Sequence, residues 1–298
     1  MANLGSRRPV LSSRPRERRL RARVRQELRA YSNTQMPTQI FPNIERAVYR
    51  QTPLVDVICQ VRFPTDLRLD TTPPSDFQQH IRSLFPVLTQ QPRIARGNLP
   101  PEFARALEFV AVPAGSQSIW KFATEDGLQI LELLSDNMTV VAHQYSRWED
   151  FSKVFAVSFE ALMKYYSPPF LARVGLRYRN VIQRSKLNLQ EANWRDLLSA
   201  PILAELADTD IEGRAREVFR NLVIALPERD ALLRLQHGFA ELEGSKEQSY
   251  LIDCDFFVER TEPQHVTETL AYFHSIAARC FRWCITERLH QAMEPRPA

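Results

Sequence analysis

The sequence predicts an α+β protein built around a mainly antiparallel sheet. Three observations support this fold class: short segments of alternating polarity come in runs of three, two long segments have helical periodicity, and one order of elements occurs twice. The chain has 298 residues, 44% of them hydrophobic, enough for one large core or two smaller ones. We therefore expect a single compact unit over residues 36–294. It consists of two similar β-α-β-β-β-α halves, 45–167 and 168–294, with two long helices packed on the sheet.

The first half begins with an alternating segment that Pro64 ends. Tight turns at Glu125-Asp126-Gly127 and Ser135-Asp136-Asn137 separate three later strands. A helix of period 3.6 follows them. The predicted elements are a strand at 54–63, a helix at about 75–85, strands at 118–124, 128–134 and 138–145, and a long helix at about 148–165.

The second half repeats this order of elements, with short helices in place of the first helix. The predicted elements are a strand at 172–183, short helices at about 194–199 and 201–206, strands at 215–226, 232–241 and 249–258, and a long helix at about 263–292. The amino-acid match between the halves is weak, so the repeat rests on the order of elements. Both arrangements of the strands, two curved sheets or one continuous sheet, are compatible with this pattern.

The charge of the chain is concentrated in an N-terminal tail, residues 1–35. The tail holds ten arginines and two glutamates, a charge of +8, which leaves −4 for the rest because the whole chain carries +4. The tail is expected to be disordered to about residue 15 and able to form a helix at 16–31. It is interpreted as an arm for nucleic acid or an acidic surface, as a transit peptide, or as an extension upstream of a start near Met36. The last interpretation is favoured, because the body makes sense without the tail.

Several classes of protein are not indicated by the sequence. No apolar run is long enough to span a membrane, and the basic N-terminus lacks the apolar core of a secretory signal. The four cysteines form no CxxC pair and lie in hydrophobic context, so buried, reduced thiols and a cytoplasmic location are expected. Cys280 and Cys284, one helical turn apart, are interpreted as core residues rather than zinc ligands. No cofactor, metal or catalytic residue is predicted, and His143 and His237 lack a nucleophile motif.

Two predicted strands carry charges at alternating positions. Arg177 and Arg179 lie two residues apart in 172–183, and Asp253 and Asp255 lie two residues apart in 249–258. Each pair therefore points to one face of its strand. Facing one another, they would form either a polar groove that binds a carboxylate or phosphate, or a ladder of cross-strand ion pairs that fixes the register. The ladder is the favoured interpretation.

The last predicted helix adds three polar residues at a spacing of four. Arg282, Thr286 and His290 would lie on one face of a continuous helix. Aimed at the arginine strand they would line a pocket with it, and otherwise they would form the solvated face of an amphipathic helix. The solvated face is favoured.

The body also resembles a known family. The segments that carry the resemblance are PLVDVICQVRFP at 53–64, YSRWEDF at 145–151, VGLRYRNVIQRSKLNL at 174–189, YLIDCDFF at 250–257 and FRWCITERLHQAM at 281–293. They resemble a sporadically distributed bacterial family of unknown function defined by a TIGRFAM model, over about residues 45–294. The resemblance implies no particular chemistry, and the family's patchy distribution suggests a defence or toxin–antitoxin context.

These observations favour a non-enzymatic binding or regulatory protein that acts through contacts with a protein partner. One alternative is a receptor for a small anionic ligand, or an enzyme of unrecognised type, that uses the arginine–aspartate groove. A second alternative is association with nucleic acid through residues 1–35 alone. No membrane partner is expected, and the sequence leaves a homodimer open.

Overall fold

The computed structural model describes residues 40–92, 118–242, 244–245 and 247–297. The chain divides into two units, Met1–Ile40 and Phe41–Ala298, and the fold described below is that of the second unit. The predictions for the basic tail, residues 1–35, lie outside the described residues. Among the described helices, none combines the length and hydropathy that crossing a bilayer requires.

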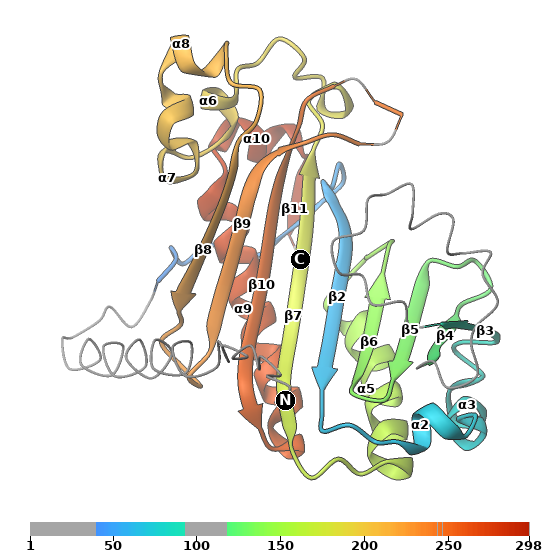
Figure 1. Ribbon diagram of the computed structural model, residues 1–298. Helices are drawn as coiled ribbons and strands as arrows, with labels where there is room; N and C mark the ends of the chain where they lie inside the picture. The colour runs from blue at the N-terminus through green and yellow to red at the C-terminus, as the bar shows by residue number, and fades with distance from the viewer. Residues whose placement is uncertain (1–39, 93–117, 243, 246, 298) are drawn as a thin grey trace, which may run out of the picture. The chain divides into compact units, whose positions relative to one another are not determined.

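The centre of the unit is one antiparallel sheet, which confirms the predicted mixture of helices with a mainly antiparallel sheet. Nine strands of the described chain join it in the order β3-β4-β5-β6-β2-β7-β10-β9-β8 (Figure 1). Their bounds are β2 Leu54–Arg62, β3 Val87–Pro92, β4 Ser118–Ala123, β5 Gln129–Leu134, β6 Asn137–Ala142, β7 Leu171–Ile182, β8 Phe219–Ala225, β9 Leu232–Ala240 and β10 Ser249–Thr261. Of the two arrangements left open by the sequence, the strands thus adopt the continuous sheet.

The strand order mirrors itself about the contact between β2 and β7. On one side the order outward from the centre is β2, β6, β5 and β4, with β3 beyond them at the edge, and on the other side it is β7, β10, β9 and β8. β2 thus pairs with β6 on one side, β7 pairs with β10 on the other, and β2 and β7 pair with one another at the centre.

Two long amphipathic helices, α5 (Trp148–Tyr165) and α9 (Val266–Cys284), lie on the same face of this sheet (Figure 1). Each turns an apolar stripe toward the core, as the 3.6-residue period predicts. Phe151, Phe155 and Leu162 of α5 are buried, as are Leu270 and Phe273 of α9. The four cysteines are free thiols within this core, as the sequence indicates.

Shorter elements surround these layers. They are β1 (Ala47–Tyr49), α2 (Arg68–Thr71), α3 (Ser75–Ile81), α6 (Trp194–Leu197), α7 (Ala200–Leu203), α8 (Thr209–Glu212), α10 (Glu287–Ala292) and β11 (Pro295–Pro297), with 3-10 turns at Ser185–Leu187, Ala204–Ala207 and Pro263–His265. The sequence did not predict β3, which pairs with β4, or the small ribbon of β1 and β11. Prolines occupy two of the three positions in β11, which hides its strand character.

The last helix differs from the continuous helix predicted at 263–292. A turn at Pro263–His265 comes first, α9 ends at Cys284, and Ile285 has an extended backbone. Thr286 then caps α10: its hydroxyl accepts a hydrogen bond from the Leu289 amide and donates one of 2.7 Å to the Asp196 carbonyl. The β-branched Ile285 followed by a threonine cap favours a helix boundary, and tertiary contacts select it here.

A glycine in β9 is required by the close approach of β8. Gly238 has φ +155°, and a Cβ atom there would lie 1.9 Å from the Val218 carbonyl oxygen. Gly127, in the turn between β4 and β5, has φ +69° but nothing within 4 Å of the same position.

We predict that Gly238→Ala lowers the free energy of unfolding by about 3 kcal/mol or more, because backbone atoms must move. Gly127→Ala serves as the control and costs about 1 kcal/mol, the strain of a left-handed residue alone. Urea unfolding of both variants measures the difference. Equal losses of stability would show that the close approach of β8 does not exclude a side chain at position 238.

Candidate functional site

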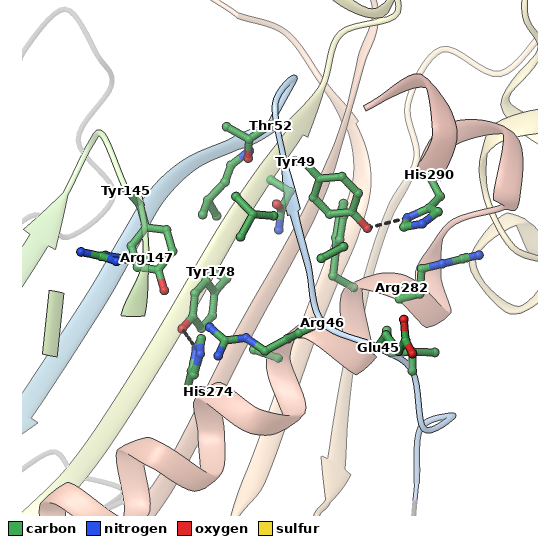
Figure 2. A pocket seen from close by; sticks show the side chains of 18 of the residues that line it. Glu45, Arg46, Tyr49, Thr52, Tyr145, Arg147, Tyr178, His274, Arg282 and His290 are labelled. Atoms are coloured by element: carbon green, nitrogen blue, oxygen red, sulfur yellow. Dashed lines mark hydrogen bonds between the residues drawn. The ribbon is translucent and has the colours of Figure 1, made fainter. Parts of the chain in front are cut away.

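A cavity of about 550 Å³ lies on the face of the sheet that carries α9 (Figure 2). Its walls come from the segment before β2, from the chain entering α5, from β7, and from α9 and α10. This volume is in the range of sites that hold a small organic molecule. Apolar side chains make up a large part of the wall, including Leu54, Ala277 and Phe281.

One wall of the cavity is a strap segment, residues 41–52, held against the end of the chain. Within it, β1 pairs with β11, and Arg50 and Gln51 donate backbone hydrogen bonds of 3.2 and 3.1 Å to the carbonyls of Glu294 and Met293. The ring of Phe41 contacts Trp283 of α9, with ring centroids 5.5 Å apart. The strap thus depends on contacts about 240 residues away in sequence.

A tyrosine–histidine pair forms the floor of the cavity. The Tyr178 hydroxyl lies 2.8 Å from Nδ1 of His274, and the His274 ring stacks on Trp148 with centroids 4.6 Å apart. Burial lowers the pKa of His274 to about 4 and raises the pKa of Tyr178 well above 10. Both groups are therefore neutral at pH 7. The buried Nε2 of His274 has no hydrogen-bond partner among the described residues.

A second tyrosine–histidine pair closes the other end. The Tyr49 hydroxyl of the strap lies 2.9 Å from Nδ1 of His290 in α10, and the two rings meet edge to face (Figure 2). Burial raises the pKa of Tyr49 to about 12 and lowers the pKa of His290. This pair is therefore also neutral at pH 7 and able to hydrogen-bond.

Three arginines line the cavity, and they differ in how firmly they are paired. Arg282 donates to the Ile285 carbonyl at 3.2 Å and to Glu287, while Arg147 pairs with Asp150 at 2.9 Å. Arg46 approaches its partner, Glu149, only to 3.9 Å.

The Arg46 guanidinium extends from the strap toward His274 and Tyr178 (Figure 2). Its positive charge adds to burial in lowering the pKa of His274, and it partly offsets the burial that raises the pKa of Tyr178 and of Tyr145. Arg46 therefore lies close enough to interact with all three groups and supplies positive charge at the wall of the cavity.

The structure brings the charged residues of β7 and β10 together, on the opposite face of the sheet. Arg177 forms a bidentate pair with Asp253, donating 2.7 Å from Nε to Oδ1 and also from Nη2 to Oδ2. Arg179 donates to Asp56 at 2.6 Å, and its Nε lies 3.8 Å from Asp253. These charges neutralise one another, which is the arrangement of a cross-strand ladder.

Asp255 and further polar groups extend this ion-pair cluster. Asp255 accepts hydrogen bonds of 2.6 and 2.7 Å from Arg173, although its direct neighbour across the strands is Arg177. Diagonal neighbours on adjacent strands lie close enough for a long arginine side chain to reach the carboxylate. His143 joins the other end of the cluster through a 2.6 Å contact with Asp56.

The predicted residues Arg282, Thr286 and His290 do not join this cluster. Arg282 and His290 line the cavity, whereas Thr286 caps α10. α9 packs on the face of β7 that carries Tyr178, and the charges of Arg177 and Arg179 alternate to the other face. One groove combining the strand arginines with the last helix is therefore absent from the described structure.

Sequence reasoning missed the residues that give the cavity its chemistry: Arg46, Tyr49, Tyr178 and His274. They come from three separate segments, the strap, β7 and α9, so no local motif relates them. The only signal was the alternation of β7, which predicts that Tyr178 points away from the arginines.

No cluster of three or more histidine, cysteine or acidic residues in the described ranges is arranged to hold a metal ion. Cys254 and Cys280 approach to 3.7 Å between sulfur atoms, and both are buried. The hydrogen bond with Cys280, together with burial, raises the pKa of Cys254. A hydrogen bond with Cys254 lowers the pKa of Cys280, but the contact with Cys284 and burial leave it well above its usual range. Both thiols remain protonated at pH 7 and act as core residues.

We predict that Asp253→Asn lowers the free energy of unfolding by about 2 kcal/mol, because Arg177 loses its bidentate carboxylate partner in a site where Asp253 is 3% exposed. The control is Asp150→Asn, the same change in an exposed pair, which costs less than about 1 kcal/mol. Urea unfolding at pH 7 compares them. Equal costs would contradict a structural role for the cluster.

We also predict that stability falls as the pH falls from 6.5 toward 4. Burial lowers the pKa of His274 and of His237 to about 4, so only the unfolded chain takes up these protons in that window. Their contribution is complete above pH 6.5 and is lost as the pH approaches 4. His274→Asn, which keeps a group near Tyr178, should make the fall shallower in urea titrations at several pH values. An unchanged slope would contradict the burial of a neutral His274.

Comparison with protein-family models found no matching family, and comparisons with curated proteins and with solved structures found no significant match to this chain. The function proposed below therefore rests on the geometry and chemistry of this chain's own residues.

Proposed function

We propose that this protein is a receptor for a small, mainly apolar molecule that carries one anionic group, and that the cavity beside α9 is its binding site. The observation that carries the proposal is Arg46, a weakly paired cation near a set of neutral hydrogen-bonding groups. An anionic ligand is also one of the alternatives expected from the sequence. Its site would lie in the cavity on the opposite face of the sheet, and not among the charges of β7 and β10.

The chemistry of the wall selects this ligand class. Leu54, Ala277 and Phe281 would bury an apolar body, which contributes about 25 cal/mol for each Å² removed from water. A guanidinium that is only partly desolvated and held by a 3.9 Å ion pair can exchange Glu149 for a carboxylate or sulfonate of the ligand. The ligand's charge would then face Arg46.

The tyrosine–histidine pairs would set the orientation of the ligand. Tyr178 with His274, and Tyr49 with His290, keep their groups neutral and fixed by a hydrogen bond at each end of the cavity. Neutral groups cost less to desolvate than charged ones, so a ligand can cover them without a large penalty. Such an arrangement supports recognition rather than acid–base chemistry at neutral pH, because pKa values of about 4 and 12 are far from 7.

The other functions expected from the sequence stay predictions. A role through a protein partner is compatible with a receptor whose ligand controls that contact. Nucleic-acid association through residues 1–35 depends on residues outside the described ranges. The arginine–aspartate cluster is a weaker candidate for ligand binding, since its carboxylates and guanidinium groups already engage one another.

We further propose that the unit is a duplication of one β-α-β-β-β-α half. The mirrored strand order about β2 and β7 supports it, as does a long helix after the last strand of each half. Superposition of residues 45–167 on 168–294 is the check. Failure to align β2, β6 and α5 with β7, β10 and α9 would sink the idea.

The receptor proposal predicts that the full chain binds 8-anilinonaphthalene-1-sulfonate, an aromatic probe with one sulfonate, in the folded state. Arg46→Gln should weaken this binding about tenfold, because it removes a charge-assisted contact. The matched control is Arg50→Gln, on the same strap but outside the lining of the cavity, which should change the affinity less than about twofold. Fluorescence titration measures both.

A second variant separates the cavity from other binding surfaces. Ala278→Phe places a large ring in the cavity and should abolish binding of the probe, while a thermal melt reports whether the fold is kept. Unchanged binding in both Arg46→Gln and Ala278→Phe would place the probe elsewhere and overturn the proposal.

A further inference from the structure

The outer strand β8 presents an unpaired edge of the sheet. In the described chain β8 pairs only with β9, and hydrogen bonds Phe239 N to Val218 O and Leu226 N to Ala231 O fix which residues face β9. Antiparallel ladders alternate, so the even-numbered residues from 218 to 226 bond to β9. The backbone groups of Phe219, Asn221, Val223 and Ala225 therefore point outward.

This edge is also unusually apolar for a strand in contact with solvent. Phe219, Leu222 and Val223 are 62%, 43% and 54% exposed. Proteins usually protect such an edge with lysine, proline, a bulge or a covering loop. Within β8, the charged side chain is Arg220, and it turns inward to the Ile202 carbonyl at 3.0 Å and to Glu205. The outward positions carry no charge, so the strand is suited to pairing with another strand.

We propose that β8 pairs antiparallel with β8 of a second copy of this chain, about a two-fold axis at Leu222. In this register Phe219 lies opposite Ala225 of the second copy, and Asn221 lies opposite Val223. All four outward-facing residues then exchange backbone hydrogen bonds. Shifting the register by two residues would leave some of these groups without a partner. The two sheets become one continuous sheet through a self-complementary contact.

Charges beyond the strand ends complement one another in the same register. The two-fold axis brings Arg214 and Arg216, before β8 in one copy, to the turn that holds Glu228 and Asp230 in the other. All four side chains are exposed, and none of them forms an ion pair within the described part of the chain. The basic residues of each copy thus meet the acidic residues of the other, once on either side of the axis. This complementarity favours a second copy of the chain over an unrelated strand.

Apolar contacts add to this pairing. Leu222 meets its own symmetry mate as a non-hydrogen-bonded pair, in which side chains lie closest. The 62% exposed ring of Phe219 covers Ala225 of the second copy. The interface thus buries the apolar side chains that would otherwise remain in water.

Sedimentation velocity on the full chain, over a range of concentrations, is the first test. The wild type should be a dimer, and Asn221→Pro should weaken it about thirtyfold, because each copy loses an outward N–H that β9 does not use. Val223→Lys is a second disrupting variant, and Ile211→Lys, on exposed α8, is the control that leaves the dimer intact. A monomeric wild type would overturn the proposal, as would a dimer that both β8 variants leave unchanged.

Charge reversal distinguishes a second copy from another protein. Glu228→Arg should weaken the dimer, and adding Arg216→Glu in the same chain should restore it, because the two positions face each other across the axis. Leu222→Cys should form a disulfide-linked dimer on mild oxidation, since the native cysteines are buried, while Ile211→Cys should not. Absence of both the rescue and the Leu222→Cys link would rule out this register, even if the chain dimerises.

Discussion

The alternation of strand β7 is the constraint on which both faces of the sheet depend. Val174, Leu176 and Tyr178 point to α9, while Arg173, Arg177 and Arg179 point to the other face. Slipping the register by one residue would bury three guanidinium groups under a helix, at a cost far larger than any packing gain. The aspartates of β2 and β10 that meet these arginines reinforce the same register. The alternation of β7 thus gives the sheet one face covered by ion pairs and one face that carries the core and the cavity.

The sequence was sufficient for the parts of the fold that depend on local periodicity. The alternating strands, the two long helices and the buried thiols follow from patterns within about twenty residues. The break at Ile285 did not follow, because it is selected by Thr286 bonding to Asp196, 90 residues away. β3 and β11 were missed because a strand with proline and little alternation is recognised only by its partner strand.

The candidate site was less predictable than the fold for a related reason. The strand charges could be foreseen as neighbours, since β7 and β10 each display them at alternating positions. The cavity requires Arg46, Tyr178 and His274 to converge from segments more than 90 residues apart. No sequence motif around any of these three residues indicates that it lines a cavity. The helical spacing of Arg282, Thr286 and His290 suggested one shared face. Because α9 ends before Thr286, however, Thr286 caps α10 while Arg282 and His290 line the cavity.

The ribbon of β1 and β11 has a consequence for the kinetics of the site. Two of the three β11 residues that pair with β1 are prolines, which have no N–H to donate. The strap over the cavity is therefore held by few hydrogen bonds, whereas β7, behind it, is paired on both sides over most of its length. A segment held by few hydrogen bonds needs less free energy to open than a strand paired on both sides. The strap can therefore detach as a local unit while the sheet stays folded. A molecule would then enter or leave the cavity at the rate of this local opening, and its residence time would be set by the ribbon more than by its own contacts.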